Sequence, residues 1–499
     1  MQRSSAPIRA VVLLLALLPS CTAKVPSDAE VVSEEVTIWP DYKDVTIPCN
    51  VAPMNFIIED PDARFVTSVS GAGGMAFAAK GPRVTFPGRK WRRLLEDNKG
   101  GALTFTIYRK SSGDGRWKRL KSFRMDVSPE PVDEYLTYRL IGPTYGMAGE
   151  MSLVQRRLTD FHTKEIYSNM MDYDRNGGQC VNCHSFQSWG TSNMQFHVRQ
   201  KDGGTIIVHD GTVSKVNLKR DGILSAGVYP SWHPTEDLIA YSVNSTYQLF
   251  YSKGARRAEV LDSNSDLILY DVTRDEVTPV LTDSTCLDTF PYWSPDGRTL
   301  FFCRASLEGI TKAAGGRITN DYDKVRYNLM RMDFNPATRS FSEPEIVFDA
   351  ASDGLSATFP RLSPDGRHLL FTLGSFGTFH IWHKDSDLYM LDFGPDGRPV
   401  PGAPWPVETI NSDDTESYHS WSSGGRWVAF SSRREDGLYT RLYLTCFDSD
   451  GAATKPFIIP QKDPESYRTL YKSFNIPEFT TEPVRQSPKD FLKVVRPGG

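Results

Sequence analysis

Two cysteines and a histidine within one pentapeptide, Cys180-Val181-Asn182-Cys183-His184, carry the most specific chemistry in this chain. Thiols three positions apart can each form a thioether with a haem vinyl group, and the histidine that follows can give an imidazole nitrogen to the iron. The chain has seven Cys and nine His in 499 residues, so coincidence is a weak explanation. The pattern therefore predicts one covalent haem c, attached at Cys180 and Cys183, with His184 as an axial iron ligand.

Three other interpretations of the cysteine pair stay open. A structural zinc site needs a second pair of ligands, but the chain has no other C-x-x-C. A thioredoxin-like redox pair normally precedes a helix, whereas Ser185, Phe186, a Trp-Gly turn and a strand pattern follow here. A motif that has lost its cofactor would look the same. The haem interpretation is favoured over all three.

A second protein ligand to the iron would suit an electron carrier, whereas an open sixth position would permit small-molecule binding or redox catalysis. An iron without a second protein ligand is one alternative. Arg433 and Arg434 are predicted as partners of the haem propionates, or as solvated charges. The candidate distal ligands are His419, His383, His380, Met194, Met170 and Met171.

His419 is favoured among these candidates because it takes the position of His184 in the repeat described below. A distal ligand must approach the porphyrin from the side away from the motif. Met194 and His197 are therefore awkwardly placed, since they lie on the strand that pairs with the motif strand. Any single histidine can also be a hydrogen-bonded strand residue.

The segment 172–177, Asp-Tyr-Asp-Arg-Asn-Gly, matches the first half of an EF-hand-type calcium loop. Position 12 of that loop is Cys183 rather than the bidentate Glu that calcium needs. A Ca²⁺ ion beside the haem is thus an alternative to a turn rich in Asp and Asn.

The first 21 residues read as a secretory signal peptide. Arg3 and Arg9 precede or flank the apolar run 10–18, which is too short to span a bilayer. Cys21 follows in the pattern Leu-Pro-Ser-Cys, which resembles a bacterial lipobox, so we expect an acylated thiol that anchors the chain in a membrane. Thr22 favours the outer membrane in that resemblance. An ordinary cleavage site is the alternative.

Composition agrees with a folded protein of the cell envelope or periplasm. Hydrophobic residues make up 39% and aromatic residues 12% of the chain, which is enough for the cores of two or three domains. The net charge of -4 gives no reason to expect a nucleic-acid partner. Cys286 and Cys303 flank one predicted hairpin and could pair, although two buried thiols are favoured.

Residues 31–128 read as short strands bounded by Gly, Pro and Asp. One helix is expected over 89–98, with Trp91, Leu94 and Leu95 on one face. We predict an immunoglobulin-like β-sandwich that ends at the Ser-Pro-Glu-Pro segment beginning at Ser128.

Beyond residue 135, a repeat of strand, tight turn and strand predicts a β-propeller over 135–485. Pro-Asp-Gly supplies the turn where it occurs, because Pro fixes φ and Gly tolerates φ > 0. Four strands per unit are typical of propeller blades. A unit that begins at the motif 180–184 comes first, and both chain ends combine in a sixth blade. The four clearest repeats are 229–242, 290–303, 359–372 and 418–431.

Three inserts, 244–266, 305–326 and 374–386, fall between the second and third strands of their blades. In a propeller this connection lies on the face where the innermost strand begins. Because Cys183 and His184 align with Phe290 and Pro291, the haem is expected on that face, at the mouth of the central channel. A protein partner is expected to dock there.

The S-P-D-G-R turns resemble those of TolB-type β-propellers of the Gram-negative envelope. The lipobox, 179–186, 194–199 and 418–434 together look like envelope lipoproteins that join such a propeller to one CxxCH. The resemblance covers roughly residues 140–480 and implies a fold and a haem site, but no defined reaction. TolB binds protein partners, and this chain departs from it in the sandwich and the haem motif.

Two functions from different classes remain. The first is a membrane-anchored c-type haem protein for electron transfer or haem redox chemistry. The second is a TolB-like scaffold that binds a protein or glycan, with a structural haem or none. No G-x-S-x-G, H-E-x-x-H or P-loop occurs, so these enzyme classes have no support, and a non-enzymatic carrier or binding protein is favoured.

Overall fold

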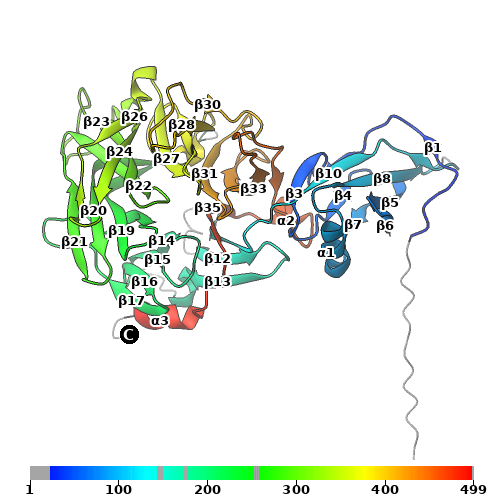
Figure 1. Ribbon diagram of the computed structural model, residues 1–499, viewed down its shortest axis with the longest axis horizontal. Coiled ribbons are helices and arrows are strands. Elements are labelled where there is room, and N and C mark those ends of the chain that lie inside the picture. The colour runs from blue at the N-terminus through cyan, green and yellow to red at the C-terminus, as the bar shows by residue number, and fades with distance from the viewer. Residues whose placement is uncertain are drawn as a thin grey trace, which may run out of the picture.

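The computed structural model describes residues 23–496, apart from 114, 143–149, 173–177, 252, 254, 255 and 257. The fold is all-β, as predicted, and places two β domains side by side (Figure 1). Cys21 and the rest of the expected signal peptide lie outside the described residues. Within the described part, no helix has the length and apolarity needed to cross a membrane.

The N-terminal domain is a β-sandwich. Phe56 of the smaller sheet packs edge-on against Phe105 and Phe123 of the larger one, with ring centroids 6.1 and 6.0 Å apart. Helix α1 (Gly88–Asp97) buries Trp91, Leu94 and Leu95, as its apolar face predicts. The larger sheet contains β1 (Glu30–Val31), β3 (Val45–Pro48), β5 (Ala63–Gly71), β6 (Gly74–Lys80), β8 (Ala102–Ser111), β9 (Lys118–Arg119) and β10 (Phe123–Ser128), and the smaller contains β2 (Ile38–Trp39), β4 (Phe56–Ile58) and β7 (Arg83–Val84).

The second domain is a propeller of six blades, each with four main strands in the part of the chain that the structure describes. Blade 1 joins both chain ends, as predicted, and contains β11 (Tyr135–Ile141), β12 (Ser152–Arg157), β13 (Thr163–Ser168) and β35 (Ser473–Thr480). Blade 2 carries the motif and contains β14 (Gln179–Phe186), β15 (Met194–Gln200), β16 (Gly204–His209) and β17 (Thr212–Val216).

Blades 3 to 6 follow along the chain. Blade 3 contains β18 (Val228–Trp232), β19 (Leu238–Phe250), β20 (Ala258–Asp271) and β21 (Glu276–Leu281). Blade 4 contains β22 (Cys286–Trp293), β23 (Thr299–Ser306), β24 (Asn328–Asn335) and β26 (Glu345–Phe348), with the short β25 (Ser340–Phe341) at its edge. Blade 5 contains β27 (Ser356–Leu362), β28 (His368–Gly374), β29 (Asp387–Asp392) and β30 (Trp405–Pro406). Blade 6 contains β31 (Glu416–Trp421), β32 (Trp427–Ser432), β33 (Arg441–Cys446) and β34 (Phe457–Ile458).

The innermost strands β35, β14, β18, β22, β27 and β31 contact one another in a closed ring. Each contains a β-bulge, in which two residues face one on the neighbouring strand. The bulges bring six side chains together on the propeller axis, and we call these residues the axial ring. The ring of Tyr229 is tilted against that of Phe290, and Phe359 meets Tyr418 edge-on, with centroids 4.3 and 4.7 Å apart. The axial ring consists of Cys183, Tyr229, Phe290, Phe359, Tyr418 and Ile476.

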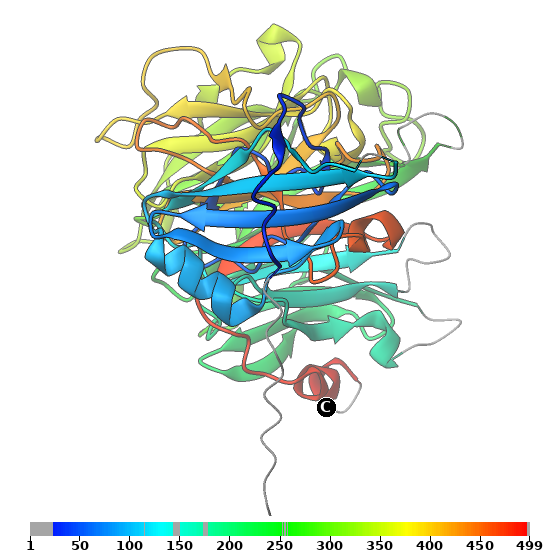
Figure 2. The same cartoon turned by 90° about the vertical axis from the view of Figure 1, so that its right-hand side faces the viewer.

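The sandwich packs against blade 6, so the two domains share one apolar core. The ring of Tyr42 lies 6.4 Å from that of Phe457, and Trp427 Nε1 donates to the carbonyl oxygen of Glu130 at 3.0 Å. Figure 2 looks onto the sandwich, with its strands and α1 in front of the propeller. The sandwich thus supports the propeller from the side.

Helix α3 (Pro488–Val495) covers blade 2 near the C-terminus. Phe491 is 0% exposed and its ring lies 5.2 Å from that of Phe196 in β15. Replacement of Phe491 with Ala is expected to lower the free energy of unfolding by about 3–5 kcal/mol, because it leaves a cavity in this core. Urea unfolding measures the change, with the exposed Lys493→Ala as the control. Equal stability of the two variants would contradict the packing of α3.

Short helices complete the described chain and lie between the strands. They are the single-turn helix α2 (Ser466–Thr469) and the 3₁₀ turns η2 (Asn169–Asp172), η3 (Tyr322–Lys324), η4 (Ala351–Asp353) and η5 (His380–Trp382).

Candidate functional site

The motif lies on β14, and the hairpin with β15 decides which of its side chains share a face. Cys180 pairs with Arg199, and Asn182 pairs with His197. Because side chains of directly paired residues point to the same face of a sheet, these four lie together. Val181 pairs with Val198 and enters the core on the other face.

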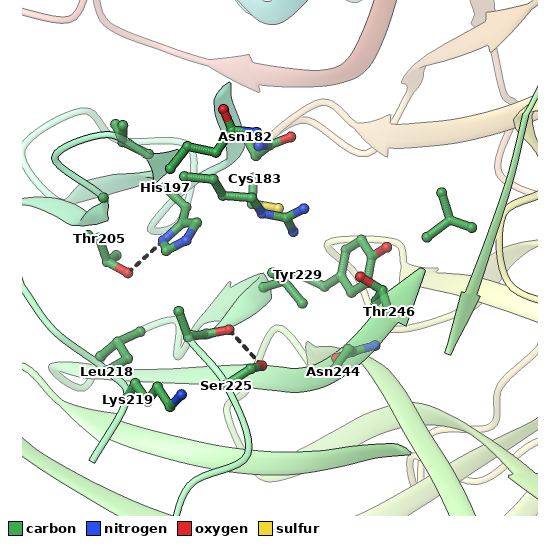
Figure 3. A pocket seen from close by; sticks show the side chains of 18 of the residues that line it. Asn182, Cys183, His197, Thr205, Leu218, Lys219, Ser225, Tyr229, Asn244 and Thr246 are labelled. Atoms are coloured by element: carbon green, nitrogen blue, oxygen red, sulfur yellow. Dashed lines mark hydrogen bonds between the residues drawn. The ribbon is translucent and has the colours of Figure 1, made fainter. Parts of the chain in front are cut away.

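A cavity of about 550 Å³ lies between blades 2 and 3 and reaches the propeller axis (Figure 3). Asn182, Cys183 and His197 line it from blade 2, and Asn244 and Thr246 from blade 3. Its size falls in the range of small-molecule and cofactor sites. The cavity is therefore the candidate site of the motif.

The cavity exists because small side chains occupy one end of the interface between blades 2 and 3. Thr205, Ser225 and Ala226 line it there. Elsewhere in the same interface, Trp232 and Tyr241 are buried with aliphatic side chains and fill the space. Sheets that pack face to face are normally about 10 Å apart, so small residues on both sides leave a slot.

Residues from two inserts also reach this cavity. Thr246 and Gln248 come from the extension of the β19–β20 hairpin, and Phe379 comes from the insert of blade 5. They line the same cavity as Cys183. The motif and these inserts thus share one face of the propeller, as the repeat pattern predicts.

Both motif cysteines are free thiols. Cys183 lines the large cavity directly. Asn182 Nδ2, from a residue that also lines the cavity, donates to Cys180 Sγ at 2.9 Å. Cys286 and Cys303 are free as well. The donor chemistry of the thiol pair fits two thioether bonds, and Cys183 places one of the thiols at this cavity.

His184 does not line the large cavity, although it shares a small space of about 20 Å³ at the axis with Cys183. Its side chain is 2% exposed and lines a separate cavity of about 140 Å³, together with Trp189 and Arg361. Burial, with a smaller effect of Arg139, lowers the pKa of His184 to about 3. The ring is therefore neutral at pH 7, and its role as an iron ligand stays a prediction.

The nitrogen Nε2 of His184 has no hydrogen-bond partner among the described residues. It lies 3.9 Å from Oε2 of Glu478. Burial raises the pKa of Glu478 to about 8, and its Oε1 accepts a hydrogen bond from the backbone N–H of Phe186 at 2.8 Å. His184 and Glu478 are thus both mainly neutral at pH 7.

His419, the favoured distal candidate, lines the small cavity together with His184. Its Nε2 donates to the carbonyl oxygen of Leu370 at 3.0 Å, and burial lowers its pKa to about 3. The structure thus brings His419 and His184 together, outside the large cavity.

The other distal candidates also lie away from the large cavity. His380 and His383 are buried near η5, where His383 Nε2 donates to Glu259 Oε2 at 2.6 Å. Met194 is buried in the core of blade 2, Met171 packs against that core, and Met170 is 51% exposed. Their role as ligands stays a prediction.

The two arginines predicted as propionate partners are engaged elsewhere. Arg433 is buried over the ring of Trp382, 4.1 Å from its centroid, and Arg434 Nη2 lies 2.8 Å from Glu416 Oε1. Neither lines the large cavity.

Three cations that were not predicted from the sequence line the large cavity instead. They are Arg139, Arg199 and Lys219. Arg139 donates from Nη1 to the carbonyl oxygen of Val181 at 3.2 Å. Arg199 pairs with Cys180 in the β14–β15 hairpin, so its place near the motif could have been predicted from the hairpin register. Arg139 lies on β11 of another blade, and no pattern near the motif in the sequence points to it.

Most of the proposed calcium loop lies outside the described residues, since 173–177 are not included. Asp172 is described, and its carboxylate lies 3.0 Å from Arg496 and 3.5 Å from Lys201. No group of three or more His, Cys, Asp or Glu in the described ranges is arranged to hold a metal ion.

The sheets define a β-propeller protein with an N-terminal β-sandwich. No family model and no curated protein matches the chain. Among solved structures, it is similar to an oligogalacturonate lyase in complex with manganese, at 13% identity and a TM-score of 0.36 over 64% of this chain and 72% of that one.

Two further solved structures are similar over large parts of the chain. The oligogalacturonate lyase from Vibrio parahaemolyticus is 12% identical, with a TM-score of 0.33 over 70% of this chain and 87% of that one. Tricorn protease is 10% identical, with a TM-score of 0.34 over 82% of this chain and 40% of that one.

Proposed function

We propose that this chain is an exported, TolB-like propeller protein of the cell envelope that carries one haem c at Cys180 and Cys183 and serves in electron transfer or haem redox chemistry. One observation carries the proposal. Both thiols of the Cys-x-x-Cys-His motif are free, Cys183 lines a cavity of about 550 Å³, and Cys180 accepts a hydrogen bond from Asn182, which lines the same cavity. A bound haem would supply one-electron redox chemistry there.

The residues around the cavity have the chemistry that such a group needs. Cys180 and Cys183 would hold it covalently. Arg139, Arg199 and Lys219 would pair with its propionates, because guanidinium and ammonium groups form charge-assisted hydrogen bonds with carboxylates. A smaller space of about 20 Å³ lies among most of the axial-ring residues, and Cys183 and His184 both line it.

The walls of the cavity suggest where a redox partner protein would dock, and the N-terminal sequence suggests where in the cell the protein is held. The inserts of blades 3 and 5 form part of its wall, so a protein that exchanges electrons with the site would dock on this face. The lipobox pattern at Cys21 supports a lipid anchor in the outer membrane, with the two domains in the periplasm or at the cell surface.

A second candidate is a binding scaffold for a protein or glycan, with a structural haem or none. It is favoured by the amides and hydroxyls that line the cavity, including Asn217, Asn244, Thr246 and Gln248. Such groups bind sugar hydroxyls well. On this alternative, the same cavity binds a polar ligand and the thiols have no redox role.

Mass spectrometry and a pyridine haemochrome spectrum separate the two candidates. The full chain is produced in cells able to attach haem c, and the mature protein is isolated. We expect one haem per chain, resistant to extraction with acidified solvent. Thiols that remain free or bridged, without added mass, would overturn the haem proposal and leave the binding scaffold.

A further inference from the structure

The small cavity of about 140 Å³ at the propeller axis leads to one inference, which does not depend on the haem. We infer that this cavity binds a compact oxyanion, either a carboxylate or an inorganic anion of similar size, beside Arg361. Two observations carry the inference. The guanidinium group of Arg361 has no carboxylate partner in the described chain, and three other hydrogen-bond donors at the same cavity lack partners there too.

Arg361 of β27 is held against aromatic rings at the wall of the small cavity. Its guanidinium carbon lies 3.8 Å from the ring centroid of Phe359 and 4.6 Å from that of Tyr292. Stacking on aromatic faces orients the planar fork of an arginine. Burial lowers the pKa of Arg361, but a guanidinium stays protonated in proteins, so a poorly hydrated positive charge lies at the cavity.

No carboxylate in the described residues forms an ion pair with Arg361. Its Nη1 donates to the carbonyl oxygen of Pro360 at 2.8 Å. Glu478 is the one acidic residue in the described lining, and its carboxyl group is directed to β14. There Oε1 accepts a hydrogen bond from the N–H of Phe186 at 2.8 Å, and Oε2 lies 3.9 Å from His184 Nε2. A guanidinium has five N–H donors, so most of the fork stays available to a planar anion with two oxygens.

Three further donors come to the small cavity from blades 3, 4 and 6. Trp232, Trp293 and Ser420 line it, and they are only 5%, 3% and 9% exposed. The indole N–H groups of both tryptophans and the hydroxyl of Ser420 have no hydrogen-bond partner among the described residues. Buried polar groups without a partner are rare and costly, and an indole N–H can only donate. The missing partner is therefore a group that supplies acceptor oxygens.

The charge and the volume together define the class of ligand. Water could satisfy the three donors, but it cannot compensate the charge of Arg361, whereas an anion does both. A cavity of about 140 Å³ holds about four or five water molecules. This suits an anion the size of acetate or nitrate and excludes a haem or an oligosaccharide. Neither Cys180 nor Cys183 lines this cavity, so the anion and a haem at the thiols would occupy different spaces.

Isothermal titration calorimetry of the full chain tests the inference. The mature protein, isolated from cells able to attach haem c, is titrated at pH 7 with acetate, with nitrate and with acetamide, the neutral analogue of acetate. We expect at least one of the two anions to bind with one site per chain and acetamide not to bind. The anion that binds more tightly shows whether the site prefers a carboxylate or an inorganic oxyanion.

Three variants locate the bound anion. Arg361→Gln is expected to weaken binding at least about tenfold, because it removes a charged hydrogen-bonding group. Ser420→Ala, a smaller change, is expected to weaken binding about threefold, the typical effect of one hydrogen bond. Arg298→Gln removes an exposed arginine from a turn of blade 4 and should retain the wild-type affinity. Urea unfolding shows that each variant is folded.

The possible results separate this inference from the haem proposal. A wild-type protein that binds neither anion, or that binds acetamide as tightly as acetate, would overturn the inference. So would equal affinities of the wild type, Arg361→Gln and Ser420→Ala. Anion binding by a protein without attached haem would support the inference and overturn only the haem proposal. Attached haem without anion binding would overturn only the inference.

Discussion

Replacement of both Cys180 and Cys183 with serine is expected to abolish covalent haem attachment completely and to leave the propeller folded. A serine hydroxyl cannot form the thioether, so no residue of the motif would retain the group. Neither thiol is part of a disulfide, Cys180 is only half-buried and Cys183 lines a cavity, so the loss of stability is expected to be about 1 kcal/mol or less. Mass spectrometry and the pyridine haemochrome spectrum measure the attachment, and urea unfolding measures the stability.

The single variants give the sharper result. Cys180→Ser and Cys183→Ser each retain one thiol at the cavity, so one thioether bond and one free vinyl group are expected. The haemochrome band should then move to longer wavelength, because an unreacted vinyl group extends the conjugation of the porphyrin. Cys286→Ser, which removes a half-buried thiol from blade 4, serves as the control. Retention of the full band in the double variant would contradict attachment at this pair.

The propeller could be predicted from the sequence because its signals are local. Pro-Asp-Gly at 295–297 and 364–366 specifies tight turns, and Gly297 and Gly366 have φ of +69° and +72°. Strand patterns on either side repeat in the other blades. Neither chain end alone carries enough strands for a blade, so we predicted that strands from both ends combine in one. The pairing of β35 with β11 in blade 1 confirms this prediction.

The arrangement of the motif side chains could not be predicted in the same way. Strict alternation along a strand would put Cys180, Asn182 and His184 on one face and Cys183 on the other. The bulge adds one residue between Asn182 and Ser185, so Cys183 and His184 leave the alternation, and only Cys183 lines the large cavity. A one-residue change in register of this kind has no marker in the sequence of β14.

The cavity itself depends on contacts between blades that are distant from the motif in the chain. Thr205 and Ser225 leave space only because blades 2 and 3 pack face to face at that point. His419 shows the converse: the repeat correctly aligned it with His184, and both line the small cavity. The alignment predicted their common position but not on which side of the axial ring it lies.

Replacement of Glu478 with Gln is expected to stabilise the protein at alkaline pH and to have little effect at acidic pH. Burial raises the pKa of Glu478 to about 8 in the folded chain, from 4.5 for the free group. Between these values the folded state holds a proton that the unfolded state has lost, so the stability of the wild type falls as pH rises through this window. Gln cannot ionise, and its Oε1 can still accept the hydrogen bond from the N–H of Phe186.

The free energy of unfolding at pH 5, 6.5 and 8.5, from urea titrations of the full chain, tests this dependence. The gain of Glu478→Gln over the wild type should be near zero at pH 5 and on the order of 2–4 kcal/mol at pH 8.5. Glu482→Gln, an exposed carboxyl near the same strand, should follow the wild-type profile at every pH. Parallel profiles for Glu478→Gln and the wild type would show that Glu478 ionises near its free pKa, and hence that the small cavity around His184 is open to water rather than closed.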